Sequence, residues 1–197
     1  VDYTNGVFTF VSSNPYGNIY MNDWNKSRGF NWENYPFTNG VYHWKDNKAV
    51  FTKYVPNAQQ SEFGEGGTFS DDKTVLDIED DAANKVLGGS WRMPTKEEFD
   101  ALCSLSKEWK TNYNDSDVKG YLFEDENNKT IFLPTTSYGS GTERASNYKD
   151  YGRYWSSSLF TDGPKPYLAH YLCFFNGTAA VYTYDRCYGQ CVRALSE

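Results

Sequence analysis

The sequence predicts an α+β fold, in which two helices accompany short antiparallel strands and a large amount of ordered loop. Three observations predict it. A capping box at Thr95 precedes apolar residues at helical spacing. The segment 74–87 repeats apolar residues every four positions and ends before Gly88. From Gly120 onwards, short apolar runs are separated by turn-forming residues, and the later runs alternate with a period of two.

Composition indicates one folded domain over residues 1–197. Of the residues, 39% are hydrophobic, 18% aromatic and 23% charged, which is unlike a disordered chain. The formal charge of −7 and the lack of a Lys/Arg cluster argue against a nucleic-acid partner. No apolar run is long enough to cross a bilayer, and Val1 begins no signal segment. We therefore expect either a protein soluble in the cell or an exported one whose leader was removed.

The N-terminal part reads as two strands followed by loop. Residues 7–11 and 19–21, within the region 1–30, have strand composition and are separated by turn formers. Residues 24–54 show no sustained period but many large aromatics, so we expect an ordered loop. We expect a more mobile loop over 56–73.

The first helix is predicted over Thr74 to Leu87. Its apolar positions Ile78, Ala82 and Val86 recur at four-residue spacing. Acidic side chains early in a helix favour the positive end of its dipole, so we expect a solvated helix start. A calcium site is the alternative, although the segment lacks the spacing and internal Gly of an EF-hand loop. The acids concerned are Asp77, Glu79, Asp80 and Asp81.

The second helix is predicted to start at Thr95, because Thr95 and Glu98 can each satisfy the other's free backbone N–H. Phe99, Leu102 and Cys103 then fall on one face. We interpret Cys103 as a small buried apolar residue.

Short strands follow the second helix. Asn127-Asn128 is a turn between the first two, and Asn176-Gly177 is the strongest hairpin signal in the chain. The predicted strands cover residues 121–123, 130–133, 154–157, 167–175, 179–184 and 191–195.

The strand before Asn176 is predicted to have two different faces. Leu168, Leu172 and Phe174 share one face, whereas Tyr171, Cys173 and Phe175 share the other. We expect the first face to hold the sheet in place and the second to be exposed, where tyrosines supply contact area to a ligand. The alternative is that these tyrosines cover a further layer of the same domain.

The residues suited to catalysis form no recognisable site. His170 and Cys173 fall on opposite faces of one strand, which argues against a nucleophilic pair. Cys187 and Cys191 lack the spacing of a zinc knuckle and a second ligand pair. Two disulfides among the four cysteines remain open, as does a pair of carboxylates for glycoside hydrolysis. We expect no catalytic residue, no metal and no cofactor.

Several motifs resemble the Fibrobacter succinogenes major paralogous domain family of Bacteroidetes surface proteins. The strongest are WRMPT within Gly88–Phe99 and YGQCVR at Tyr188–Arg193. Further matches lie at 51–54, 72–76, 79–83, 131–134 and 154–158, so the resemblance spans roughly residue 32 to the C-terminus.

The resemblance implies a C-type-lectin-like fold without established enzyme activity, usually exported and often lipid-anchored. It implies an extracellular or outer-surface location after removal of an export signal, and membrane contact only through an upstream anchor. We expect a monomer that binds a protein or a glycan. The Glu-Pro-Asn and Gln-Pro-Asp signatures of calcium-dependent sugar binding are absent.

One departure from the family pattern is Cys191, where such sequences commonly carry Ser. Some relatives are variable proteins of diversity-generating retroelements, in which randomised adenines turn Asn codons into a restricted set of residues. That set excludes Lys, Glu, Gln, Met and Trp, and none of these occurs between Tyr167 and Gly189. Within the C-terminal region 160–195 we therefore expect the ligand contacts to be His170, Tyr171, Cys173, Phe175, Thr178, Ala180, Tyr182, Tyr184, Asp185, Cys187 and Tyr188.

Two other functions remain open. The C-type-lectin-like fold also occurs in the copper-dependent formylglycine-generating enzymes, which use cysteines near the C-terminus, although the spacing of Cys187 and Cys191 does not match theirs. A structural adhesin or pilus-tip module is the other alternative.

Overall fold

The computed structural model describes residues 42–45, 48–51, 54–55, 70–140, 143–144, 146–165, 168–186 and 188–196. The strands expected at 7–11 and 19–21 lie outside these residues, as does most of the loop expected at 56–73. Of the irregular loop expected over 24–54, residues 24–41 lie outside the described residues, and the expectation is wrong for 42–45 and 48–51. There, β1 (Tyr42–Lys45) and β2 (Lys48–Phe51) pair as an antiparallel hairpin.

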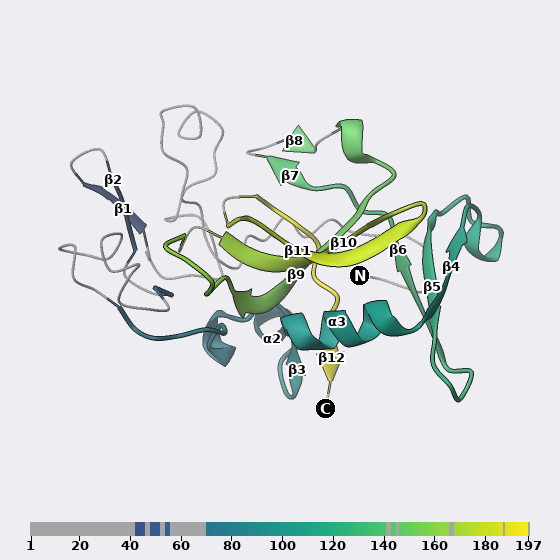
Figure 1. Cartoon of the computed structure of the whole chain (residues 1–197), viewed down its shortest axis with the longest axis horizontal. Coiled ribbons are helices and arrows are strands. Elements are labelled where there is room, and N and C mark those ends of the chain that lie inside the picture. Colours follow the sequence, from purple (N-terminus) through teal and green to yellow (C-terminus); the bar gives the residue numbers. More distant parts are fainter. Residues whose placement is uncertain are drawn as a thin grey trace.

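The central sheet is formed by three long C-terminal strands (Figure 1). These are β9 (Gly152–Leu159), β10 (Leu168–Phe175) and β11 (Thr178–Asp185), with β10 in the middle and both pairings antiparallel. The turn between β10 and β11 contains Gly177 at a φ of 94°, a conformation that favours glycine. The hairpin predicted at Asn176-Gly177 is thus confirmed.

The strand expected over residues 191–195 is largely absent. Cys191 makes a single parallel bridge to Tyr154. Only β12 (Leu195–Ser196) is a strand, and it pairs with β3 (Trp91–Arg92) far earlier in the chain.

A second antiparallel sheet contains β4 (Ser106–Lys110), β5 (Gly120–Glu124) and β6 (Thr130–Pro134), with β5 in the centre. The sequence predicts β5 and β6 but not β4, whose mainly polar residues show no alternation. The remaining short elements are β7 (Gly139–Ser140), β8 (Glu143–Arg144), η5 (Tyr113–Asp115) and η6 (Ser146–Tyr148).

The helix predicted over 74–87 is shorter than expected. It consists of a 3-10 turn, η4 (Ile78–Asp80), and the helix α2 (Ala82–Leu87). Asp80 and Asp81 are both buried, which contradicts the solvated helix start. Asp81 is the N-cap of α2, because its carboxylate accepts hydrogen bonds from the backbone N–H groups of the first turn. Of the apolar positions that recur at four-residue spacing, Ala82 is buried, whereas Ile78 and Val86 are exposed.

The helix predicted from Thr95 is confirmed as α3 (Lys96–Ser104), with the expected capping box between Thr95 and Glu98. Phe99 is buried, and Leu102 and Cys103 pack against the same core cluster. The interpretation of Cys103 as an apolar packing residue agrees with this position.

Core clusters lie on both sides of the central sheet. On one side, α3 and the second sheet pack Phe99 and Phe123 against Leu172 and Phe174. On the other, Trp155 and Tyr171 pack with a group that includes Tyr54, Ala82, Ala83 and Met93. In Figure 1, α3 and the β7–β8 pair lie on opposite sides of the sheet. The sheet is therefore a middle layer rather than one covered on a single face.

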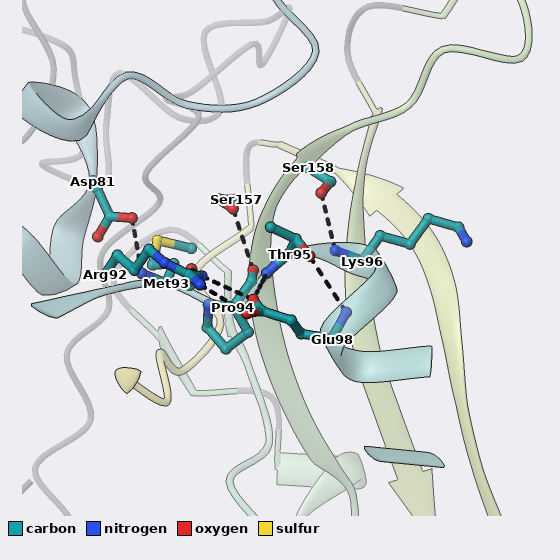
Figure 2. A network of polar contacts seen from close by, with 9 residues as sticks. All are labelled: Asp81, Arg92, Met93, Pro94, Thr95, Lys96, Glu98, Ser157 and Ser158. Atoms are coloured by element: carbon teal, nitrogen blue, oxygen red, sulfur yellow. Dashed lines mark hydrogen bonds and ion pairs between the residues drawn. The ribbon is translucent and has the colours of Figure 1, made fainter. Parts of the chain in front are cut away.

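The motifs far apart in sequence meet beside β9 (Figure 2). The Pro94 carbonyl accepts a 2.7 Å hydrogen bond from the Ser157 N–H, and the Lys96 N–H donates to Ser158 Oγ at 2.9 Å. Asp81 accepts from the Met93 N–H at 2.8 Å. These bonds join α2, α3 and β9 into one framework, which fixes the strand that begins at Gly152.

Candidate ligand-binding face

The β10–β11 register places most of the predicted ligand contacts on one side of the sheet. Tyr171 lies opposite Tyr182, Cys173 opposite Ala180, and Phe175 opposite Thr178. Because side chains alternate along a strand, these residues and Tyr184 share a face. We call it the aromatic face, and its members are Tyr171, Cys173, Phe175, Thr178, Ala180, Tyr182 and Tyr184.

Exposure divides the aromatic face into a buried and an open part. Tyr171 and Cys173 are each only 5% exposed, so the expectation that this face is open along its whole length is wrong. They lie on the central strand and are covered, as in the alternative of a further layer. Phe175 at the strand end and Tyr182 on the edge strand are 38% and 46% exposed. The open part is therefore confined to the hairpin end and to β11.

The other predicted contacts lie elsewhere. His170 and Asp185 occupy alternate positions on the opposite side of the sheet, which confirms that His170 and Cys173 face different ways. His170 is buried near Phe160, and burial followed by the nearby Lys96 lowers its pKa. Burial raises the pKa of Asp185. Cys187 lies outside the described residues.

A group of tyrosines extends the aromatic face beyond the sheet. Tyr138, Tyr148 and Tyr151 come from the segment that contains β7 and β8, and Tyr188 follows β11. Their ring centroids form a chain, with 5.3 Å between Tyr138 and Tyr148 and 4.8 Å between Tyr184 and Tyr188. We call the following residues the tyrosine cluster: Tyr138, Tyr148, Tyr151, Tyr171, Tyr182, Tyr184 and Tyr188.

Arg153 lies inside the tyrosine cluster. Its guanidinium carbon is 4.6 Å from the ring centroid of Tyr138, 4.9 Å from that of Tyr184 and 5.0 Å from that of Tyr148. The rings of Tyr171 and Tyr151 lie at 5.5 Å and 5.9 Å. A cation over the face of an aromatic ring is attracted by the ring quadrupole, so these rings stabilise the buried charge.

The backbone of Arg153 is held from two sides. Its N–H donates to Thr136 Oγ1 at 2.9 Å, and its carbonyl accepts from Thr136 Oγ1 at 3.2 Å and from the Cys191 N–H at 3.1 Å. Thr136 and Ser137 in turn donate their N–H groups to the Tyr151 carbonyl. These hydrogen bonds hold the segment that contains Tyr138 against the start of β9.

Sequence reasoning missed Arg153, Tyr138, Tyr148 and Tyr151. A usable signal exists for Arg153, because it directly precedes the predicted strand 154–157 and its apolar residues Tyr154 and Trp155. A charged side chain that becomes buried at such a position needs partners. The three tyrosines lie in irregular chain, where periodicity gives no information about contacts.

Cys103 and Cys173 are not suited to nucleophilic chemistry. Burial raises the pKa of the Cys173 thiol, although Arg153 acts in the opposite direction. Burial likewise raises the pKa of Cys103 to about 11. Both thiols therefore remain protonated near neutral pH, whereas the thiolate is the reactive species. The same effect raises the pKa of Tyr184 to about 12, so its hydroxyl stays neutral and can donate a hydrogen bond.

The described part of the chain contains no group of three or more His, Cys, Asp or Glu side chains arranged to hold a metal ion. In that same part, no helix combines the length and the apolar character needed to span a membrane.

Comparison with known proteins found no matching family model, no matching curated protein and no matching solved structure.

Proposed function

We propose that this chain is a non-catalytic binding module of C-type-lectin-like fold, displayed on a cell surface, that recognises a protein or glycan ligand. The observation that carries the proposal is the exposure of Phe175 and Tyr182, 38% and 46%, on one side of the β10–β11 hairpin. Tyr182 belongs to the tyrosine cluster, and Phe175 contacts its member Tyr151. Exposed aromatics favour binding because each offers a wide contact area with few torsions to freeze. The contacting residues are Phe175, Thr178, Ala180 and Tyr182, with Tyr184 and Tyr188 at the margin.

The arrangement of the motifs supports a scaffold role for them. Arg92 and Glu98 form a two-pronged ion pair, with N–O distances of 2.8 Å and 2.7 Å, and the Thr95 N–H also donates to Glu98. The ion pair connects β3 to α3, and the bonds of Pro94 and Lys96 to Ser157 and Ser158 attach the start of α3 to the end of β9 that lies away from Gly152. The chain thus separates the residues that hold the fold from the exposed residues of the hairpin.

The same separation favours diversification by a retroelement. Thr178, Ala180 and Tyr182 on β11 are only partly buried, so substitutions there leave the core clusters largely intact. We expect the gene to lie beside a near-identical template repeat and a reverse-transcriptase gene. Sequencing the locus tests this, and a gene that lacks both neighbours rejects diversification but leaves the binding role standing.

The binding role is tested by probing a glycan and protein array with purified wild-type chain and two double variants. Phe175→Ser with Tyr182→Ser removes the exposed aromatics. We expect at least a tenfold loss of affinity for the array ligand, because aromatic side chains that become buried at an interface contribute most of the binding energy. Val86→Ser with Leu87→Ser is the matched control, since these side chains are exposed on α2 and lie outside the aromatic face.

The control variant should bind as the wild type does. Circular dichroism and the melting temperature of each variant separate a lost contact from a lost fold. The proposal is wrong if the Phe175/Tyr182 variant remains folded and keeps full affinity, or if only the Val86/Leu87 variant loses it.

A further inference from the structure

Arg153 carries a buried positive charge for which the described residues supply no carboxylate. The side chain is 7% exposed, and its Nε and Nη1 have no hydrogen-bond acceptor within the described residues. The ion pairs formed in that part of the chain involve other cations, namely Lys73, Arg92, Lys96, Lys110 and Lys119. Ring faces stabilise a guanidinium, but they do not accept its in-plane N–H bonds. Unsatisfied donors on a buried cation are costly, and they indicate a missing anion.

We propose that Arg153 is the anion-binding centre of the aromatic face and that its ligand is a carboxylate carried on a sugar ring. The inference rests on the proposed binding function and specifies its ligand class. A guanidinium pairs with a carboxylate through two parallel hydrogen bonds, so Arg153 has the donors that this group needs. The surrounding tyrosines provide ring faces for the C–H groups of a pyranose and neutral hydroxyls for its oxygens.

The ligand reaches Arg153 when a tyrosine of the margin turns outwards. Tyr184 is half-buried, and its ring centroid lies 4.9 Å from the guanidinium carbon. Turning Tyr184 outwards loses this ring contact and its hydrogen bond to Arg153. A bidentate carboxylate replaces that hydrogen bond with two charge-assisted ones, and the other four rings remain in place.

The net charge selects among anionic ligands. A chain with a formal charge of −7 repels a ligand that carries many negative charges, so heparin-like polymers and strongly acidic peptides are disfavoured. A single carboxylate on an otherwise neutral ring meets one local cation and little of this repulsion.

The test is a titration of the wild-type chain with sodium glucuronate and with glucose, which differ at C6, followed by N-acetylneuraminate as a second acid. The readouts are calorimetry and the NMR resonance of the Arg153 Nε–H. We expect saturable binding of at least one acid, with a shift of that resonance, and at least tenfold weaker binding of glucose. Arg153→Lys keeps the charge but loses the two-pronged geometry, so acid binding should fall at least tenfold. Val86→Ser with Leu87→Ser, exposed on α2 and outside the aromatic face, is the matched control and should keep the wild-type affinity for the acid.

Equal binding of glucose and glucuronate overturns the inference, as does an unshifted Arg153 Nε–H at saturation. If Arg153→Lys does not fold, the shift of the Arg153 Nε–H resonance in the wild-type chain tests the inference alone. A short acidic peptide is titrated in the same way, and if it binds while neither sugar acid does, the anion site stands but the sugar assignment is overturned. If array ligands depend on Phe175 and Tyr182 while neither acid binds, this inference fails and the proposed function stands.

Discussion

At the scale of single residues, Glu98 combines several roles that the sequence shows only in part. Its carboxylate accepts hydrogen bonds from Arg92 and from the Thr95 N–H. The capping box is local, so the residue spacing alone predicts it. The pairing with Arg92 depends on how the chain turns at Pro94, which no local pattern specifies.

Replacing Glu98 by Gln should cost about 1 kcal/mol of unfolding free energy at pH 7, because the amide keeps a capping acceptor but loses the half-exposed ion pair. Hydrogen bonds from Arg92 lower the Glu98 pKa below its ordinary 4.5. The stabilisation is therefore fully present above about pH 4.5 and is lost as the pH falls through the lower folded-state pKa.

Urea denaturation between pH 3 and pH 7 measures this difference. Glu97→Gln is the matched control, since Glu97 is exposed in the same helical turn. A stability difference between wild type and Glu98→Gln that persists unchanged at low pH contradicts the charge pairing.

At the scale of elements, the close approach of β9 and β10 is the most sensitive point of the central sheet. Gly152 pairs with Phe174, and a Cβ at this position would lie 1.9 Å from the Phe174 ring. Phe174 is fully buried between β5 and α3, so it has little room to move.

Gly152→Ala should therefore destabilise the protein by about 2 kcal/mol or more, because overpacking forces strained rotamers or a backbone shift. Thermal and urea unfolding of the variant measure the effect. Gly163→Ala is the control, since its nearest heavy atom is 3.9 Å away, and it should unfold like the wild type. Equal stability of the two variants would show that the two strands do not approach as described.

The elements differ in how far the sequence predicts them. α3 and the β10–β11 hairpin follow local rules of capping, alternation and turn residues, and both are confirmed. The segment 74–87 misleads because Asp81 is used to cap α2 and to bind the Met93 N–H, which starts the helix later than its periodicity indicates. β4 forms through its pairing with β5, a contact that its own polar sequence does not show.

At the scale of the whole molecule, the error in the predicted site has one cause. Alternation correctly places Tyr171, Cys173 and Phe175 on one face, but it cannot tell whether a second layer covers that face. The segment around Tyr138 and Tyr151 supplies part of this layer, and it joins the aromatic face through contacts between residues distant in sequence. Within the described part of the chain, only the hairpin end and the edge strand β11 leave part of this face exposed to solvent.

The most direct test of the account is a map of amide chemical shifts upon addition of the strongest array ligand to isotope-labelled chain. We predict the largest changes at Phe175, Thr178 and Tyr182, and small ones at Val86 and Leu87 on α2. Largest changes at α2 and β3, with the β10–β11 hairpin unaffected, would contradict it.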